Sequence, residues 1–268
     1  MDYDVIVIGA GHNSLTCAAY LARAGKSVLV LEAAPVIGGA TQTQEFHPGY
    51  RNSVYAYALS LLHPQVITDL KLKDYGLDII EKQGGNLSLL NDDVLVLGKT
   101  MSERQREIAR YSQHDAQVYP LFEAEIETVA VALRALAQAA PPGLSLTLRN
   151  LPKLARSAKT LASLSLHART TLAELMTRSL GDYLNSWFES DALKGLLGLE
   201  CAIGNFVDPY ATGSAYVLLH HAFGEVNGKS GAWGHARGGM GSVSQAIAGS
   251  ACAAGAQIET DNYVEKIL

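Results

Sequence analysis

The chain has 268 residues, enough for one large domain or two ordinary ones, and its 48% hydrophobic and 18% charged residues support a sizeable core rather than disorder. The net charge of -5 argues against a nucleic-acid-binding domain, because such domains are normally basic. Three scattered cysteines form no CxxC pair, so neither a zinc site nor a dithiol redox centre is predicted.

The sequence lacks the marks of export. Its start, Met1-Asp2-Tyr3-Asp4, has no basic segment, and the apolar run that follows is too short for a signal peptide. No run approaches the roughly 18 apolar residues of a membrane span. Scattered thiols fit a reducing compartment. We therefore expect a protein of a bacterial-type cytoplasm or of an organelle matrix, not a secreted one.

The first predicted elements form a strand, a helix and a second strand. Val5–Ile8 is a short apolar run of β-branched residues and predicts a buried parallel strand. Ser14–Ala24 predicts a helix that ends at Gly25, with Cys17 on its buried face. Val28–Leu31 predicts a second buried strand, and the three elements together make a βαβ unit.

The rest of the chain is mainly loop and helix. The predicted elements are an ordered loop over 35–49, a hairpin over 87–97 that turns at Asn91-Asp92-Asp93, helices over 102–140, 148–204 (interrupted near Gly181) and 210–223, a glycine-rich loop over 224–241, a small-residue helix over 243–254, and strands at Ile258 and over 263–268. The α/β character at both ends therefore brackets a long helical insertion. The chain stops in or just after a strand, so we expect a fragment.

A glycine-rich turn joins the first strand to the first helix. The segment Gly9-Ala10-Gly11-His12-Asn13-Ser14 has the spacing of a dinucleotide-binding turn. Gly9 permits the tight turn, Gly11 lets the backbone approach a pyrophosphate, and the third position requires a small residue. Ser14 occupies that third position in place of glycine. The helix that begins here directs free N–H groups at the phosphates, and we expect His12 to act through its backbone N–H.

An acidic residue follows at the end of the second strand. The Glu32 carboxylate can accept hydrogen bonds from ribose hydroxyls and would repel a 2′-phosphate, which favours FAD or NAD over NADP. The alternative is a generic glycine turn beside a surface glutamate. Just beyond Glu32, the adjacent Gly38 and Gly39 allow a loop to pass close beside a cofactor.

The segment Asp4–Thr41 resembles the FAD-binding opening of the amine-oxidase and phytoene-desaturase superfamily. The matching positions are Gly9, Gly11, Ala18, Leu21, Gly25, Val28, Val30, Glu32, Gly38 and Gly39. Residues 11–13, 48–50 and 60–65 are similar to a branch related to bacterial carotenoid desaturases. Residues 231–234 and 238–241 resemble the glycine loop at which the chain re-enters the FAD domain, with a flexible surface connection as the alternative.

The resemblance implies the fold, the cofactor and most of the site. It implies a Rossmann-like α/β FAD-binding domain with a parallel sheet and an inserted, largely helical substrate domain, with the C-terminal part missing. The implied domains are 1–85 for the first part of the FAD-binding domain, 86–230 for the substrate domain and 231–268 for the incomplete return. In such proteins the residue at Val264 contacts adenine through its backbone. The expected cofactor site comprises Gly9, Ala10, Gly11, His12, Asn13, Ser14, Glu32, Ala33, Gly38, Gly39, Ala40, Thr41, Gly239, Met240 and Val264.

The implied reaction is hydride transfer from a hydrophobic small molecule to flavin. The resemblance favours carbon–carbon dehydrogenation or isomerisation over amine oxidation. We name no catalytic residue, because a flavin carries the difficult chemistry itself. Two alternatives stay open: a truncated, non-catalytic FAD-fold remnant that serves as a binding module, and an NAD-dependent dehydrogenase.

A basic amphipathic helix is predicted over 149–161. Four cations share one side of it and four apolar residues the other, namely Arg149, Lys153, Arg156 and Lys159 against Leu151, Leu154, Ala158 and Leu161. Two interpretations are open. In the more common case the apolar side of such a helix packs on its own domain and the basic side is solvated. Alternatively, the helix makes peripheral contact with an anionic membrane. No metal site is predicted, because His63, His220 and His221 lack carboxylates or cysteines at ligand spacing.

Overall fold

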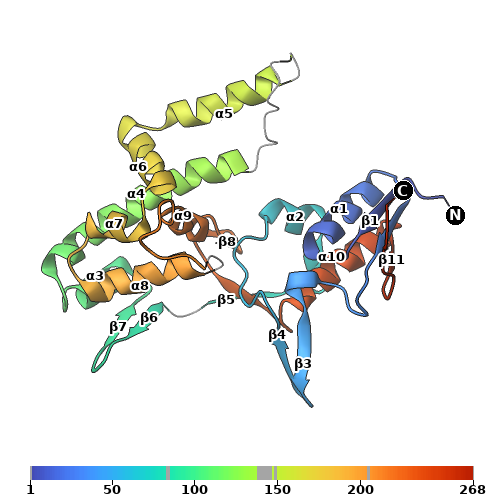
Figure 1. The fold of residues 1–268 in the computed structure, drawn as a ribbon, viewed down its shortest axis with the longest axis horizontal. Helices are drawn as coiled ribbons and strands as arrows, with labels where there is room; N and C mark the ends of the chain where they lie inside the picture. The colour runs from blue at the N-terminus through green and yellow to red at the C-terminus, as the bar shows by residue number, and fades with distance from the viewer. Residues whose placement is uncertain (1, 83–84, 138–146, 148–149, 204–205, 268) are drawn as a thin grey trace. The chain divides into compact units, whose positions relative to one another are not determined.

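The chain divides into two compact units (Figure 1). The computed structural model describes residues 2–82, 85–137, 147, 150–203 and 206–267. Unit 1 joins Met1–Lys82 to Gly224–Leu268, and unit 2 is the segment Gln83–Phe223. The sequence placed the second boundary later, at 230/231. It lies earlier because Glu225 already bonds within unit 1, where its N–H donates to the Ser60 carbonyl oxygen at 2.9 Å.

Unit 1 is an α/β domain built on a small parallel sheet. Its elements are β1 (Val5–Ile8), α1 (His12–Arg23), β2 (Val28–Leu31), the 3-10 helix η1 (Gly39–Thr41), β3 (Thr43–His47), β4 (Tyr50–Ser53), α2 (Pro64–Asp69), the 3-10 helix η2 (Leu72–Tyr75), β5 (Ile79–Glu81), β8 (Glu225–Val226), β9 (Lys229–Ser230), β10 (Gly234–Ala236), α10 (Gly241–Ala253) and β11 (Gln257–Glu259). β2 lies between β1 and β11, and both pairings are parallel. The predicted βαβ unit is thus confirmed.

One face of this sheet forms the core of unit 1. Val5 pairs with Val28 and Val7 with Val30. Val28 and Val30 belong to the core that includes α1 and α10, and the half-buried Val7 packs against it. The two helices pack against each other, and their buried positions are mostly alanines: Ala18, Ala19, Ala22, Ala246, Ala248 and Ala251. Small side chains let helix axes approach closely. The start of α1 is therefore held firmly at the end of β1.

The other face of β1 is open. Ile6 and Ile8 alternate with the inward-facing valines and are 56% and 51% exposed. Within the described residues β1 pairs with β2 alone, so it forms an edge of the sheet.

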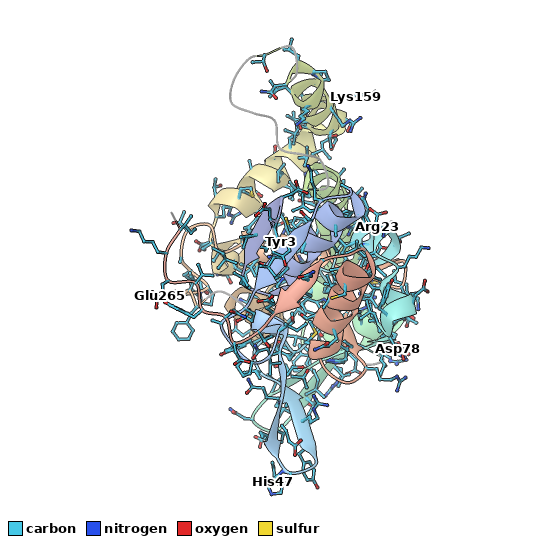
Figure 2. All side chains as sticks on the ribbon, turned by 90° about the vertical axis from the view of Figure 1, so that its right-hand side faces the viewer. Tyr3, Arg23, His47, Asp78, Lys159 and Glu265 are labelled. Carbon is cyan, nitrogen blue, oxygen red and sulfur yellow. The ribbon has the colours of Figure 1, made fainter. Side chains whose placement is uncertain are left out.

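A β-hairpin occupies part of the segment predicted as a loop over 35–49. β3 and β4 pair antiparallel, and Figure 2 shows His47 at the tip of the hairpin. The turn lies at Pro48-Gly49, where Gly49 has a φ of 82°. The prediction missed these strands because they are largely exposed, Phe46 to 72%, and lack the apolar alternation of a half-buried strand.

The C-terminal predictions are correct in part. The strand at Ile258 is confirmed as β11, and the helix predicted over 243–254 is α10, which begins slightly earlier. The strand predicted over 263–268 is wrong for residues 263–267, where the backbone pairs with no described strand. The placement of Cys17 on the buried face of α1 is also wrong. Its side chain is exposed, because the buried stripe runs through Leu15, Ala18 and Ala22.

Unit 2 is mainly helical. Its elements are β6 (Asn86–Leu89), β7 (Val94–Leu97), α3 (Met101–Ile108), α4 (Gln113–Ala137), α5 (Leu151–Ser163), α6 (Leu166–Thr177), α7 (Leu180–Asn185), α8 (Asp191–Ala202) and α9 (Tyr216–Ala222). β6 and β7 form the hairpin predicted over 87–97. The predicted helix over 102–140 is two helices, and its residues 138–140 lie outside the described chain. The interruption predicted near Gly181 is confirmed, because α6 ends at Thr177 and α7 begins at Leu180.

The core of unit 2 forms around α4. Phe122 of α4 meets Phe188 at a ring-centroid distance of 5.0 Å and Trp187 at 5.6 Å, both edge to face. Leu175 and Leu180 belong to the same cluster and are fully buried, while Trp187 packs against it and is half-buried. Among the helices that the structure describes, none is long and apolar enough to cross a membrane.

The alanine packing of α10 leads to the first prediction. Ala246 is fully buried, so Ala246→Leu forces extra methyl groups into a filled core and should lower the free energy of unfolding by about 1–3 kcal/mol. Urea denaturation followed by circular dichroism measures this change. The control is Ala253→Leu, an exposed position of the same helix, which should leave stability nearly unchanged. Equal effects at the two positions would contradict the packing.

Candidate dinucleotide site

The turn after β1 offers backbone N–H groups to an anion. Gly9 has a φ of 87°, and its N–H donates to the Leu31 carbonyl oxygen at 2.7 Å. Gly11 is the N-cap residue of α1, and no side chain of the described residues caps this helix. The first intrahelical bond joins the Leu15 N–H to the Gly11 carbonyl oxygen. The preceding N–H groups of the first turn therefore point out of the helix, where an anion is favoured.

Glu32 holds the turn in place. Its Oε2 accepts a hydrogen bond from the Ala10 N–H at 2.7 Å, and its Oε1 accepts one from the Ala34 N–H at 2.9 Å. A carboxylate offers about four acceptor positions, so capacity is left for donors such as sugar hydroxyls. Glu32 is half-buried at the end of β2. The single carboxylate thus joins the glycine turn after β1 to the chain that follows β2.

The loop at Gly38 lies directly beside the turn. The Gly38 N–H donates to the Ala10 carbonyl oxygen at 2.9 Å, and Gly38 forms an isolated parallel bridge with Gly11. A Cβ on Gly39 would lie 3.3 Å from the Gly11 Cα, and Gly39 has a φ of 54°. Close approach and the left-handed backbone both favour glycine here. The two glycines therefore form a second wall of the site.

Polar contacts connect this wall to α10. Thr41 is buried, donates from Oγ1 to the Gly38 carbonyl oxygen at 2.7 Å, and shares a short hydrogen bond with the Ser244 hydroxyl. The Met240 N–H donates to Ser53 Oγ at 3.0 Å, and the Gly241 N–H donates to Thr43 Oγ1 at 2.9 Å. The loop before α10 is therefore held at the base of the β3–β4 hairpin.

Most of the sequence-predicted residues lie in one neighbourhood. The turn, Glu32 and the Gly38–Thr41 loop are joined by hydrogen bonds, while Asn13, Ala33 and Ala40 are exposed. Gly239 and Met240 border this neighbourhood through β3 and β4. The structure ties the late chain to Glu32 through Asn262, whose N–H donates to the Glu32 carbonyl oxygen at 2.9 Å, and gives Val264 no such contact.

Sequence reasoning missed Ala34, Asn262 and Ser244. Ala34 lies two residues beyond Glu32, so a local turn could have indicated it. Ser244 meets Thr41 only through the tertiary fold, and no motif marks it.

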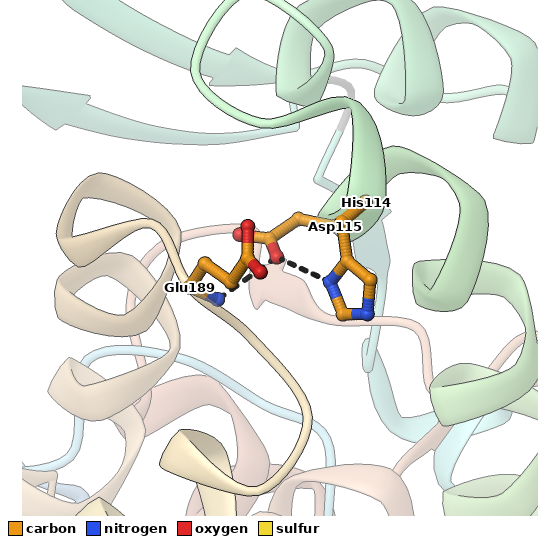
Figure 3. A group of neighbouring side chains, drawn as sticks. All are labelled: His114, Asp115 and Glu189. Atoms are coloured by element: carbon orange, nitrogen blue, oxygen red, sulfur yellow. Dashed lines mark hydrogen bonds and ion pairs between the residues drawn. The ribbon is translucent and has the colours of Figure 1, made fainter.

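Unit 2 holds a cluster of His114, Asp115 and Glu189 whose potential ligand atoms lie within 4.8 Å of one another (Figure 3). Asp115 is fully buried, and its Oδ1 and Oδ2 accept hydrogen bonds from the N–H groups of Glu189 and Ser190, both at 2.9 Å. Ser190 is the N-cap of α8. This carboxylate therefore links the start of α4 to the start of α8, and each of its oxygens already accepts a backbone N–H.

The histidines weighed from the sequence lie elsewhere. His63 caps α2, where its Nδ1 accepts from the Gln65 N–H at 3.1 Å. The side chains of His220 and His221 lie outside those that the structure describes.

Comparison with known proteins agrees with this geometry. The model of the NAD(P)-binding Rossmann-like domain family matches residues 7–83. A solved oxidoreductase from Methanosarcina mazei aligns with 98% of this chain and 52% of its own, with a TM-score of 0.61 and 18% identity. Cyclohexylamine oxidase from Brevibacterium oxydans aligns with 96% of this chain and 51% of its own, with a TM-score of 0.51 and 21% identity. The chain thus has a Rossmann-like dinucleotide-binding fold with a helical insertion.

The chain is also homologous to a named mammalian protein along nearly its whole length. It is 40% identical over 281 residues to pyridine nucleotide-disulfide oxidoreductase domain-containing protein 2 of Rattus norvegicus, an alignment that covers 99% of this chain and 48% of the relative. The chain therefore spans about half the length of this relative.

The role of Glu32 can be tested without a cofactor. Glu32→Ala removes the acceptor for two backbone N–H groups, so we expect the free energy of unfolding to fall by about 1–3 kcal/mol in urea titrations. Glu259→Ala is the control, because that exposed side chain at the end of β11 accepts only from the Asn262 side chain. An unchanged stability of Glu32→Ala would show that the turn is held by other contacts.

The buried carboxylate of unit 2 makes a similar prediction. In Asp115→Asn an amide N–H₂ replaces one acceptor, which leaves the N–H of Glu189 or Ser190 unpaired and should cost about 1–3 kcal/mol of stability. Asp191→Asn is the control, since its side chain is 99% exposed. We expect millimolar Mg²⁺, Ca²⁺ or Zn²⁺ to leave the melting temperature of the parent chain unchanged. A clear rise that Asp115→Asn abolishes would identify a metal site instead.

Proposed function

We propose that unit 1 binds FAD, with the pyrophosphate at the turn of residues 9–14 and the adenosine ribose at Glu32. The proposal rests chiefly on one observation. The Ala10 N–H to Glu32 hydrogen bond of 2.7 Å sets an uncapped helix N-terminus and a ribose-binding carboxylate side by side. Phosphate favours the first of these groups and sugar hydroxyls the second.

The walls of the site support FAD over NAD. Both cofactors share the ADP half, so the choice depends on what lies beside the turn. The Gly38–Thr41 loop is bonded to Ala10 and approaches Gly11 closely, which gives an extended cofactor a surface beyond its pyrophosphate. We propose that Gly38, Gly39, Ala40 and Thr41 contact the part of FAD that extends beyond the pyrophosphate. Gly239, Met240 and Val264 complete the proposed site.

We further propose that the protein oxidises a hydrophobic small molecule. Bound FAD accepts the hydride, while the protein positions the substrate against the flavin and provides the electrostatic environment. The resemblance to phytoene desaturases favours a carbon–carbon bond as the place of oxidation, while the fold shared with an enzyme named cyclohexylamine oxidase keeps amine oxidation as a competing reaction. The chain spans about half of its relative, so this activity is proposed for the protein that contains the whole fold.

A second candidate function is that of a binding module without catalysis. The open edge of β1 favours it, because Ile6 and Ile8 are more than half exposed beside unpaired backbone. Flavin binding distinguishes the two candidates, since a module of this kind needs no cofactor.

Gly11→Ala tests the cofactor site directly. The new Cβ meets no atom within 4 Å and the backbone φ of -71° suits alanine, so the fold should be unchanged. The methyl group would occupy space that the pyrophosphate needs. We expect FAD affinity, measured by flavin fluorescence titration, to fall roughly tenfold or more, because one lost phosphate hydrogen bond costs on the order of 1–3 kcal/mol.

The matched control is Gly195→Ala on α8, which also meets no atom within 4 Å. It should bind FAD like the parent chain. Equal FAD affinity of parent and Gly11→Ala would place the cofactor elsewhere. Tight NADH binding with no FAD binding would replace the proposal with an NAD-dependent dehydrogenase.

A further inference from the structure

The helix α5 leaves most of its apolar side uncovered. None of its residues is buried, and Leu151 and Leu161 are 47% and 39% exposed. At 100° per residue these leucines fall on the same side as Ala155 and Ala158, which are also exposed. The helix contacts α4 within unit 2 (both are labelled in Figure 1), and Leu154 is half-buried, but no side chain of α5 is fully buried. Among the described residues, the packing of its apolar face on its own domain, weighed from the sequence, is therefore limited to Leu154.

The other side of α5 carries cations without partners. Lys153, Arg156 and Lys159 are exposed, and within the described part of the chain their side chains form no ion pair or hydrogen bond. Figure 2 shows Lys159 on the outside of this helix. Arg149 lies outside the described residues. Unpaired cations beside an uncovered apolar face distinguish α5 from an ordinary solvated helix, in which one face is packed.

The charge of this segment is opposite to that of the whole chain. Residues 150–172 contain no aspartate or glutamate, whereas the chain carries a net charge of -5. The fourth cation of the segment, Arg169, donates to the carbonyl oxygens of Ala162 and Leu164 and so is held next to the end of α5. The positive charge is thus concentrated where the apolar side is open.

We propose that α5 binds the surface of an anionic lipid bilayer. The helix lies in the plane of the interface, with Leu151 and Leu161 among the acyl chains and Lys153, Arg156 and Lys159 at the head groups. Charge complementarity selects an anionic surface, because each lysine or arginine close to it strengthens binding about fivefold. The inference goes beyond the proposed cofactor site, and its test requires no FAD.

The test is co-sedimentation of the chain with sucrose-loaded vesicles of phosphatidylcholine and phosphatidylglycerol, against vesicles of phosphatidylcholine alone. We expect binding to the anionic vesicles only, weakened at high salt. Lys153→Gln/Arg156→Gln/Lys159→Gln should lower the partition coefficient roughly a hundredfold, from three factors of about five. Leu151→Ser/Leu161→Ser should also lower it, because it removes the inserted apolar surface. All five positions are exposed, so circular dichroism should show unchanged folding.

Two controls make the outcome decisive. Lys71→Gln/Lys73→Gln/Lys266→Gln removes the same charge from exposed positions outside α5 and should bind vesicles nearly as tightly as the parent. Leu89→Ser removes a leucine that is 77% exposed on β6 and should have no effect. The proposal is overturned by equal binding to neutral vesicles, by absent binding to both, or by equal losses in the α5 variants and the controls. If the chain binds neither kind of vesicle, a protein partner becomes the alternative ligand of the apolar face of α5.

Discussion

The hydrogen bond from the Ala10 N–H to the Glu32 carboxylate is the interaction on which the candidate site depends. It joins Ala10, two residues beyond β1, to Glu32, the residue after β2, so the ends of two parallel strands act as one surface. The same carboxylate also holds Ala34, and the Glu32 backbone accepts from Asn262. The acid proposed to bind the ribose and the helix terminus proposed to bind the phosphates consequently keep a fixed separation before any ligand arrives, which lowers the ordering cost of binding.

The alanine-lined contact of α1 and α10 supports this arrangement from behind. Because the buried positions of both helices are small, α10 can bring Ser244 up to Thr41, next to the glycine wall. Segments from opposite ends of the chain thereby build one site. The helical unit inserted between them has its own core around Phe122, and it exposes the basic helix α5. The cofactor site and the proposed membrane surface are therefore carried by different parts of the chain.

Sequence alone was sufficient where a local pattern determines structure. The βαβ unit, its turn and Glu32 follow from strand, glycine and acid in fixed order, and those elements are present. Patterns failed where structure depends on distant partners. The β3–β4 strands are exposed and lack apolar alternation, residues 263–267 have no described strand to pair with, and the Asp115 cluster joins helices far apart in sequence. The contact of Thr41 with Ser244 could not be predicted either, because the two residues are far apart in sequence and meet only in the folded chain.

The most direct test of the central claim is the visible absorption spectrum of the purified chain after incubation with FAD and gel filtration. The account predicts that flavin bands stay with the protein fraction, because the residues that hold the ADP half of the cofactor all lie in unit 1. A colourless protein fraction, from a chain that circular dichroism shows to be folded, would contradict the claim that this unit forms a flavin site by itself.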